Sequence, residues 1–470
     1  MSACISGTVN NLCRPVGGGM ENIMNLEGKK VLVAGGGKSG ISSIKLLMSG
    51  GKAVPVLYDG NVNFLLPEEL LGVVETRLGE FKKEFLEGMD LLVISPGIPI
   101  DSDIVLTAQA MNIPVWGEIE LAYYFEKGKV VAITGTNGKT TTTALTGEIM
   151  KAAFPEVFVV GNIGIPYTEE VTKTTESSIT VAEISSFQLE STHEFAPKIT
   201  AILNITPDHL NRHKTMENYI AVKESITKNQ NPADVCILNY EDVVLREFGT
   251  SLDCRVMYFS SETVLRDGLF YEDGALYYSV SGEKTLICKT DDMKIIGAHN
   301  YENAMAAAAA GIAMGIDIVT IGKVICDFVA IEHRIEFVKE VNGVLYYNDS
   351  KGTNPDSSIK AVNSMTRPTF LIAGGSEKNS DFTDFAKTFK GHLKKLVLIG
   401  VTRFKIADAA KEQGFDEIIF AESLKEAVEF CHDNAVDGDA VLLSPACASF
   451  DMFKNYEERG RIFKEYVRAL

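Results

Sequence analysis

The segment with the clearest chemical signature runs from Val130 to Thr141 and reads Val-Val-Ala-Ile-Thr-Gly-Thr-Asn-Gly-Lys-Thr-Thr. Glycines let a backbone wrap a phosphate, and the N-terminus of a following helix adds free N–H groups and a positive dipole end. Lys139 would reach the terminal phosphates of a nucleotide, and the Thr140 hydroxyl would hold Mg²⁺. The pattern predicts ATP binding by Gly135, Thr136, Asn137, Gly138, Lys139, Thr140 and Thr141.

The alternative for this loop is an ordinary glycine-rich turn, because Ile133 stands where the standard phosphate-loop pattern has glycine. Further polar residues favour the phosphate reading. Activation of a carboxylate by ATP requires several anionic oxygens to be held together and screened by metal ions. Glu183 ends a predicted strand, and His209 follows the next one. Taken singly, these would be a solvated carboxylate and a structural histidine, and Lys223 would be a solvated helical lysine.

The loop Gly135–Thr140 resembles that of the Mur ligase and folylpolyglutamate synthetase superfamily, and the resemblance extends from about Leu26 to Leu470. It implies three domains and ATP-dependent amide-bond formation through an acyl phosphate. It also implies catalytic roles for Lys139, Glu183, His209 and Lys223, and a carbamylated Lys223. Two Mg²⁺ sites are expected, with Thr140, Glu183, His209 and Lys223 as metal ligands. Ser185, Ser186 and Gln188 are expected beside the substrate.

Two asparagines begin the Ala-rich segment near His299. Asn300 and Asn303 are spaced to share a helix face, and amides can read the edge of adenine. The resemblance gives them this role, whereas helix-start capping is the alternative for Asn300. Further nucleotide contacts are expected from Arg334, Asp349 and Lys351.

A second glycine loop, Gly35-Gly-Gly-Lys-Ser-Gly40, follows a predicted strand, opens a helix and precedes Asp59. This is the dinucleotide fingerprint, and alone it predicts an NAD-dependent dehydrogenase. Physically it requires only a pyrophosphate at a helix N-terminus, which a uridine diphosphate also satisfies. The resemblance assigns this domain to the uridine diphosphate of the substrate. The expected contacts are Lys38, Ser39, Gly60, Asn61, Ser95 and Gly97, with Asn162 facing the sugar.

The last third of the chain carries the residues expected at the incoming amino acid. A dicarboxylic amino acid needs cations and hydroxyls at both ends, and a dry slot in which its amine attacks unprotonated. The segment from Ser444 to Asp451 reads Ser-Pro-Ala-Cys-Ala-Ser-Phe-Asp. Family members that add other amino acids carry different loops there, so this segment favours D-glutamate. The expected contacts are Lys351, Thr353, Lys378, Ser449, the Phe450 backbone and Tyr456.

The expected reaction therefore adds D-glutamate to UDP-N-acetylmuramoyl-L-alanine, as a step of peptidoglycan precursor synthesis. Three alternatives stay open. A folylpolyglutamate synthetase would use other substrates, an oxidoreductase would leave the Gly135–Thr140 loop unexplained, and a non-catalytic nucleotide-binding scaffold would have no use for the candidate metal ligands. Separate nucleotide and amino-acid domains also lead us to expect closure on ligand binding.

The elements that must position these residues alternate between short β-branched runs and helical patterns, which indicates an α/β fold with parallel sheets. Hairpin signals at Asp273-Gly274 and Ser281-Gly282 predict a small antiparallel patch between Leu269 and Lys289. The expected domains are a flexible extension at 1–25, a Rossmann-like UDP-binding domain at 26–117, a central ATP-binding domain of the P-loop ATPase type at 118–332, and a Rossmann-like amino-acid-binding domain at 333–470.

Composition narrows the class of protein further. The chain has 470 residues, 46% of them hydrophobic, and a formal net charge of −18, which argues against a nucleic-acid binder. The eight cysteines form no C-x-x-C pair, so free thiols in a reducing compartment are expected. Neither a signal peptide nor a membrane span is recognised. We expect a cytoplasmic monomer acting on small molecules, which starts at Met1, Met20 or Met24.

Overall fold

The computed structural model describes residues 25–162, 164–329, 332–376 and 380–470. The chain divides into two units. The first comprises the residues up to Tyr258 together with Ala309–Ile316, and the second comprises Phe259–Ala308 and Asp317–Leu470. Apart from Asn25, the expected N-terminal extension lies outside the described residues.

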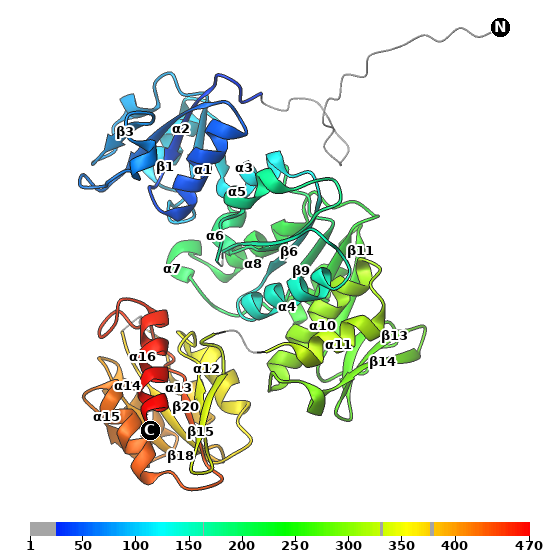
Figure 1. Ribbon diagram of the computed structural model, residues 1–470, viewed down its shortest axis with the longest axis vertical. Helices are drawn as coiled ribbons and strands as arrows, with labels where there is room; N and C mark the ends of the chain where they lie inside the picture. Colours follow the sequence, from blue (N-terminus) through cyan, green and yellow to red (C-terminus); the bar gives the residue numbers. More distant parts are fainter. Residues whose placement is uncertain (1–24, 163, 330–331, 377–379) are drawn as a thin grey trace, which may run out of the picture. The chain divides into compact units, whose positions relative to one another are not determined.

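The first unit opens with a five-stranded parallel sheet of order β3-β2-β1-β4-β5. Figure 1 shows its strands β1 and β3 in blue, beside α1 and α2. Its central strands consist largely of buried valine and leucine, as expected for a parallel sheet covered on both faces. Residues of α1 and α3 pack on one face and residues of α2 on the other. The elements are β1 (Lys30–Ala34), α1 (Lys38–Ser49), β2 (Val54–Asp59), β3 (Glu75–Leu78), β4 (Leu91–Ile94), α2 (Asp103–Ala110), β5 (Val115–Gly117) and α3 (Glu118–Phe125).

Strands β10, β9, β6, β8 and β7 belong to a nine-stranded sheet of order β14-β13-β12-β11-β10-β9-β6-β8-β7, and these five strands pair in parallel. Strand β6 lies between β8 and β9, so the loops after these strands emerge at one edge. The elements are β6 (Lys129–Thr134), α4 (Lys139–Lys151), β7 (Val157–Gly161), α5 (Tyr167–Glu170), β8 (Ile179–Glu183), α6 (Ser186–Leu189), β9 (Ile199–Ile202), α7 (Leu210–His213), α8 (Met216–Glu224), β10 (Val235–Asn239), α9 (Val243–Gly249) and β11 (Arg255–Ser260).

The second unit begins with the end of β11, whose last two residues pair with β12. The expected antiparallel patch is confirmed, because β12, β13 and β14 form consecutive hairpins. Their turns are Asp273-Gly274 and Ser281-Gly282, and all four residues have positive φ angles. The elements here are β12 (Gly268–Glu272), β13 (Ala275–Val280), β14 (Glu283–Lys289), α10 (Ala298–Ala313), whose residues from Ala309 on count with the first unit, and α11 (Ile318–Asp327).

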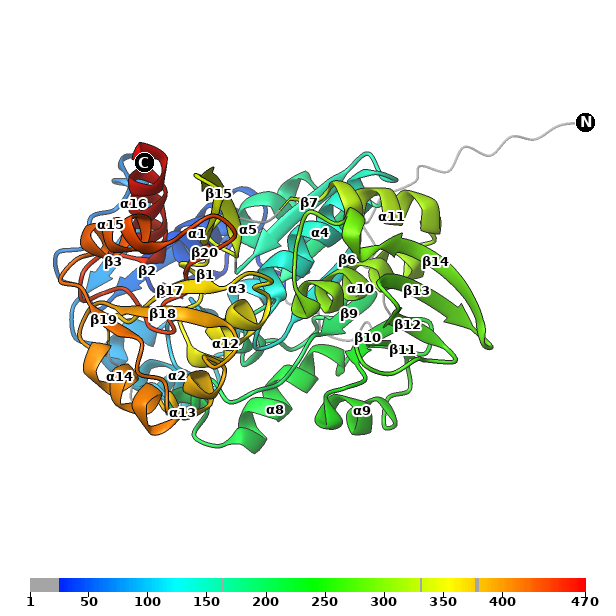
Figure 2. The same ribbon diagram turned by 90° about the horizontal axis from the view of Figure 1, so that it is seen from below.

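A six-stranded sheet of order β15-β16-β20-β17-β18-β19 completes the second unit. Residues of α12, α13 and α14 pack on one face, and those of α15 and α16 on the other, as Figure 2 shows. The elements are β15 (Glu336–Val341), β16 (Val344–Asn348), α12 (Pro355–Asn363), β17 (Thr369–Ala373), α13 (Thr383–Lys387), β18 (Leu393–Leu398), α14 (Arg403–Glu412), β19 (Ile418–Phe420), α15 (Leu424–Asn434), β20 (Ala440–Leu443) and α16 (Tyr456–Ala469).

The predicted α/β class with parallel sheets is thereby confirmed. Within the described residues, none of the helices combines the length and the apolar character that crossing a membrane requires.

Candidate functional site

The loop between β6 and α4 has the conformation that a phosphate-binding loop requires. Gly135 has a φ of 152° and Gly138, the N-cap of α4, has a φ of 85°, so both occupy backbone regions that favour glycine. The Lys139 ammonium folds back over the loop and donates to the carbonyl oxygens of Gly135 and Thr136, each at 2.8 Å. Thr140 and Thr141 are buried in the first turn of α4. The loop therefore presents a lysine and a helix N-terminus together.

The loop is held from the neighbouring strand by Asn204, which follows β9. Its side-chain oxygen accepts from the Asn137 amide at 2.8 Å, and its backbone oxygen accepts from the Thr136 amide at 2.9 Å. The Thr136 hydroxyl lies 3.1 Å from the Tyr219 hydroxyl of α8. These contacts fix the curvature of the loop before any ligand arrives.

Glu183 ends strand β8 and is buried. One carboxylate oxygen accepts a hydrogen bond from the Asn162 side chain at 2.9 Å, whereas Oε2 is buried without a hydrogen-bond partner. A buried carboxylate oxygen that lacks a partner is costly, and a bound cation would satisfy it. Glu183 therefore fits a divalent metal. Asn162, which is expected to face a sugar, also orients this carboxylate.

Lys223 of α8 is 1% exposed, and its ammonium donates to the Gly135 carbonyl at 2.8 Å. Burial and the neighbouring Lys139 charge lower the pKa of Lys223 well below its usual value, while Asp208 and Glu183 oppose that shift. Lys139 and Glu183 thus both act electrostatically on Lys223 beneath the loop. A lowered pKa increases the neutral, nucleophilic fraction of a buried amine.

His209 has a left-handed backbone conformation, with a φ of 53°, just before α7. Its ring lies against the Phe187 ring at 4.9 Å between centroids, and its Nε2 is 3.5 Å from an Asp208 oxygen. About half of its side chain is exposed, so this histidine is accessible to a ligand. Within the described residues, no group of three or more His, Cys, Asp or Glu side chains is arranged to hold a metal. The expected metal ligands include only two residues of those types, so this finding leaves them as predictions.

Ser185 and Gln188 form a reciprocal capping box at the start of α6. The Gln188 side chain accepts from the Ser185 amide and hydroxyl, and its amide group lies 3.4 Å from the buried Glu118 carboxylate. Burial raises the pKa of Glu118. Ser186 is buried and contacts the His213 ring nitrogen at 3.0 Å. The residues expected beside the substrate are therefore held rigidly at the edge of the sheet.

The Gly35–Gly40 loop makes hydrogen bonds to side chains of its own domain that its sequence pattern does not predict. The Asp59 carboxylate accepts from the backbone amides of Gly36 at 2.7 Å and Asn61 at 2.8 Å. This carboxylate, the residue that would select NAD, is thus engaged in shaping the loop. The Ser95 hydroxyl donates to the Gly35 carbonyl at 3.2 Å.

Other expected contacts of this loop cluster around the same helix N-terminus. Lys38 and Ser39 lie in the first turn of α1, and Gly60 and Asn61 directly follow β2. The Lys38 ammonium donates to the Gly164 carbonyl. Gly97 is exposed in the loop after β4, two residues beyond Ser95.

In the second unit, Asn303 donates from its side chain to the Asn300 side-chain oxygen at 3.1 Å. Asn300 donates to the Ile296 carbonyl and is the third residue of α10. The capping alternative for Asn300 is therefore wrong, because a capping side chain accepts a hydrogen bond from the helix start. The preceding residue, His299, is partly buried, and desolvation of its ring lowers its pKa to about 3.

The loop after β16 contains several of the residues expected at nucleotide and amino acid. Asp349 is buried, accepts from the Ser444 hydroxyl at 2.7 Å, and has its pKa raised by burial to about 7. The Lys351 ammonium lies 5.5 Å from the centre of the Tyr456 ring. The Thr353 amide donates to the Lys351 carbonyl at 2.9 Å. Asp349, Lys351, Ser444 and Tyr456 thus belong to one region of this unit.

The remaining expected residues of this unit are less closely grouped. Ser449 is buried and Phe450 is exposed, and Arg334 has an electrostatic effect on the Asp349 carboxyl. Lys378 lies outside the described residues. Ser376, two positions before it, donates to an Asp451 oxygen at 3.1 Å.

Sequence reasoning missed Arg459 of α16, which is 1% exposed. Its guanidinium donates to the Ser350 carbonyl at 2.7 Å, the Ser350 hydroxyl at 3.0 Å and the Cys447 carbonyl at 3.2 Å. It thereby ties the Asp349–Thr353 loop to the Ser444–Asp451 segment. The signal was available, because Arg459 lies four residues before the buried Phe463, on the face that α16 presents to the sheet.

Comparison with known families gives three matches along the chain. Residues 29–117 match the Mur ligase MurD-like N-terminal domain, residues 133–311 the Mur ligase middle domain, and residues 333–447 the Mur ligase glutamate ligase domain. Together the three matches follow one another from the first sheet to the third.

Two curated proteins are similar over nearly their whole length. The UDP-N-acetylmuramoylalanine–D-glutamate ligase of Lachnoclostridium phytofermentans is 51% identical over 95% of this chain and 99% of its own. The protein of the same name from Lachnospira eligens is 53% identical over 95% of this chain and 100% of its own.

Solved structures share the fold at lower identity. A pseudomurein peptide ligase type C from Methanothermus fervidus has a TM-score of 0.60 and 18% identity, covering 94% of this chain and 99% of its own. The UDP-N-acetylmuramate–alanine ligase MurC from Thermotoga maritima has a TM-score of 0.59 and 19% identity over the same shares of the two chains.

Proposed function

This chain belongs to the Mur ligase family, and we propose that it is an ATP-dependent ligase that joins D-glutamate to UDP-N-acetylmuramoyl-L-alanine in peptidoglycan precursor synthesis. The observation that carries the proposal is the identity of 51% to 53% with two ligases of that name over almost their entire length. The nucleotide loop and the buried Glu183 beside it supply groups that such a reaction needs.

The proposed chemistry has two steps. The carboxylate of the muramoyl-alanine attacks the γ-phosphate of ATP, which gives an acyl phosphate and ADP. The D-glutamate amine then attacks the acyl carbon, and phosphate leaves. In the first step Lys139 and the amides of the loop would hold the phosphates, since preformed donors stabilise developing charge without reorganising. Asn300 and Asn303 are proposed to read adenine, and Arg334, Asp349 and Lys351 to contact the nucleotide.

Mg²⁺ would screen the repulsion between the substrate carboxylate and the phosphates when it is bound. The proposed ligands are Thr140, Glu183, His209 and Lys223. Glu183 suits this role because its Oε2 atom is buried without a hydrogen-bond partner. A cationic Lys223 would repel the metal, so we propose that Lys223 is carbamylated and that two Mg²⁺ sites form.

Carbamylation is chemically reasonable at Lys223. The neutral amine attacks carbon dioxide, a C–N bond forms, and a proton is released to give a carbamate anion. The step needs an unprotonated amine, and burial beside Lys139 lowers the pKa of Lys223 in the required direction. The reaction replaces the Lys223 ammonium, a cation, with a carbamate whose oxygens can bind a metal.

Replacement of this lysine provides the test. We expect Lys223→Ala to lower kcat by at least about a hundredfold, a loss of roughly 3 kcal/mol of transition-state stabilisation. A short-chain carboxylate such as acetate should restore part of the rate, because it supplies the missing oxygen ligand. Full activity in the unsupplemented variant would refute the proposal. Thermal unfolding of the variant controls for loss of fold.

The amino-acid slot is proposed to comprise Lys351, Thr353, Lys378, Ser449, the Phe450 backbone and Tyr456. The uridine diphosphate is proposed to contact Lys38, Ser39, Gly60, Asn61, Ser95 and Gly97, with Asn162 facing the sugar and Ser185 and Gln188 beside the substrate. An assay of phosphate release tests the substrates directly. D-glutamate should support release in the presence of ATP and the UDP substrate, whereas L-glutamate, L-alanine and meso-diaminopimelate should not. Release with L-glutamate and a folate would favour a folylpolyglutamate synthetase instead.

The proposal includes a cytoplasmic, monomeric protein. ATP and nucleotide-linked sugars are substrates of that compartment, and the six cysteines among the described residues are free thiols, as a reducing compartment favours. Sedimentation of the purified protein tests the oligomeric state.

A further inference from the structure

Arg212 makes an unusual set of contacts for a residue that no part of the proposed reaction uses. Its guanidinium donates to one Glu190 oxygen from Nε at 3.1 Å and from Nη2 at 2.5 Å. The same group donates to the Pro96 carbonyl at 3.0 Å and to the Ile98 carbonyl at 3.2 Å. The side chains of Arg212 and Glu190 are 13% and 4% exposed. This is a nearly buried ion pair whose cation also binds two backbone carbonyls.

The two carbonyls belong to the loop that follows β4. Ser95, at the start of that loop, contacts Gly35 in the Gly35–Gly40 loop, where the uridine diphosphate is proposed to bind. The Arg212 guanidinium therefore binds the backbone of the loop that borders the proposed uridine-diphosphate end of the substrate site.

The other side of Arg212 reaches the proposed metal ligand His209. The Arg212 amide donates to the His209 carbonyl at 2.9 Å. The guanidinium also lies 4.2 Å from the centre of the Phe187 ring, and that ring packs against the His209 ring. Arg212 thus supports His209 through the backbone and through an aromatic neighbour.

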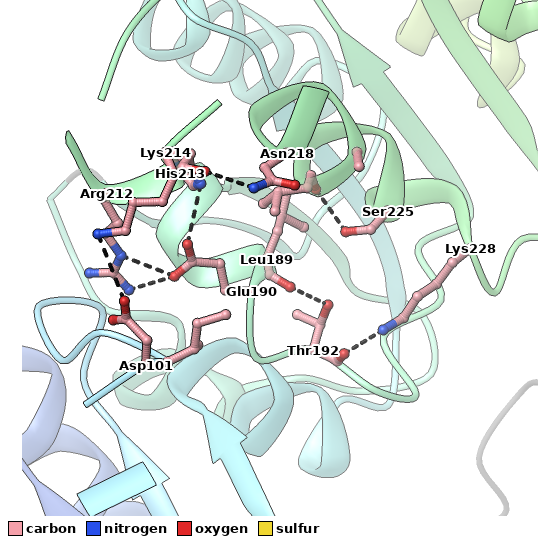
Figure 3. Close-up of a pocket in the computed structure, with 13 residues that line it drawn as sticks. Asp101, Leu189, Glu190, Thr192, Arg212, His213, Lys214, Asn218, Ser225 and Lys228 are labelled. Carbon is pink, nitrogen blue, oxygen red and sulfur yellow. Dashed lines mark hydrogen bonds and ion pairs between the residues drawn. The ribbon is translucent and has the colours of Figure 1, made fainter. Parts of the chain in front are cut away.

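Glu190 extends the connection to α6. Its second oxygen lies 3.3 Å from His213 Nδ1, and His213 Nε2 lies 3.0 Å from the Ser186 hydroxyl. Figure 3 shows Arg212 and His213 converging on the single Glu190 carboxylate. The carboxylate therefore fixes both residues relative to the helix that carries Ser186 and Phe187.

From this geometry we infer that Arg212, neutralised by Glu190, is a positioning residue that holds the uridine-diphosphate end and the reacting carboxylate end of one substrate in register. The inference rests on the proposed function, because it requires a substrate that binds at both ends. Arginine suits the task because its planar fork donates in several fixed directions, which a lysine cannot do. A small misplacement of the reacting carboxylate would be costly to the rate.

A cavity of about 540 Å³ lies beside the pair, lined in part by Asp101, Thr192 and Lys228. The Lys228 ammonium donates to the Thr192 carbonyl, so this cation is already engaged. We assign the cavity no ligand. The cavity is relevant to the test, because a shorter side chain at position 212 would border open space and would not displace neighbouring core residues.

The test compares Arg212→Met and Arg212→Lys with the unsubstituted protein. Three quantities are measured: kcat/KM for the UDP substrate, the inhibition constant of UDP alone, and the dissociation constant of ATP. Arg246→Met is the matched control. Arg246 is another arginine of the first unit that donates to a backbone carbonyl, of Tyr240, and lies 5.1 Å from the centre of that residue's ring.

We expect Arg212→Met to lower kcat/KM for the UDP substrate at least tenfold, with UDP inhibition and ATP affinity changed less than threefold. Arg212→Lys should give an intermediate loss, and Arg246→Met should match the unsubstituted protein. A merely structural role would instead lower the thermal midpoint and change all three quantities together.

Other outcomes overturn the inference. An equal loss in UDP affinity and in kcat/KM would confine Arg212 to the nucleotide loop. An unchanged kcat/KM would leave it no role in turnover, and failure of both Arg212 variants to fold while Arg246→Met folds would assign it to stability alone. Absence of D-glutamate-dependent turnover in the unsubstituted protein would count against the proposed function instead.

Discussion

Among single residues, Asp349 should leave a signature in the pH dependence of stability. Burial raises the pKa of this carboxyl to about 7, against 3.8 in the unfolded chain. Between these values the folded state keeps a proton that the unfolded state releases, so stability falls as pH rises from about 4 to 7. The full effect is roughly 4 kcal/mol. We therefore expect the thermal midpoint of Asp349→Asn, minus that of the unsubstituted protein, to be several degrees larger at pH 8 than at pH 5.

The measurement is the difference in thermal midpoint between variant and unsubstituted protein across that pH range. The difference isolates Asp349, because groups common to both proteins cancel. Asp356→Asn, on the neighbouring helix α12, is a control that shares the substitution but not the burial. Parallel midpoint curves for Asp349→Asn and the unsubstituted protein would show that this carboxyl does not carry the effect.

The sequence predicts which residues belong to the candidate site more readily than it predicts the side-chain contacts that these residues make. The positions of Gly138, Lys139 and Glu183 followed from strand-loop-helix patterns, since parallel strands bring their carboxyl ends to one edge. The contact between Asn162 and Glu183 could not be predicted, because it joins two strand ends through side-chain geometry. Arg212 was overlooked for a similar reason: its partners lie 22 and more than 110 residues away.

At the scale of elements, the close contact between α1 and the loop before it explains why glycine is required at position 40, the last glycine of the dinucleotide fingerprint. A Cβ atom at Gly40 would lie 1.8 Å from the Gly35 carbonyl oxygen, a backbone atom that cannot move aside easily. We expect Gly40→Ala to destabilise the first domain by about 1–3 kcal/mol, as overpacking usually does. Thermal unfolding should show the loss as a midpoint lower by several degrees.

Gly37→Ala provides the matched control in the same loop. A Cβ atom at Gly37 would meet no atom within 4 Å, although this residue is the N-cap of α1, where alanine is less favourable than glycine by up to about 1 kcal/mol. Its midpoint should stay close to that of the unsubstituted protein. If the two alanine variants unfolded at the same temperature, close packing of helix on loop would not be the reason for Gly40.

The elements that the sequence predicted well are the buried ones. Strands β1, β8, β16 and β20 coincide with runs of mostly apolar or β-branched residues, which contrast with the polar loops around them. Edge strands such as β3 and β15 were missed, since one side faces solvent and charged residues interrupt the pattern. One signal for β15 was present: Asn342-Gly343 forms its hairpin turn, with φ angles of 51° and 80°.

Across the whole molecule, the formal net charge of −18 opposes the approach of substrates that are themselves anionic. Added salt screens this repulsion, since the Debye length shortens to about 10 Å at 0.1 M. We therefore expect kcat/KM for the UDP substrate to rise about twofold to threefold between 10 and 150 mM KCl, at saturating ATP and Mg²⁺. The value of kcat should change little, because the lysines and amides at the proposed site act at short range.

Choline chloride in place of KCl should give the same rise if screening, rather than binding of potassium, is the cause. A fall in kcat/KM with salt would instead show that the cations around the proposed uridine-diphosphate loop outweigh the field of the rest of the protein.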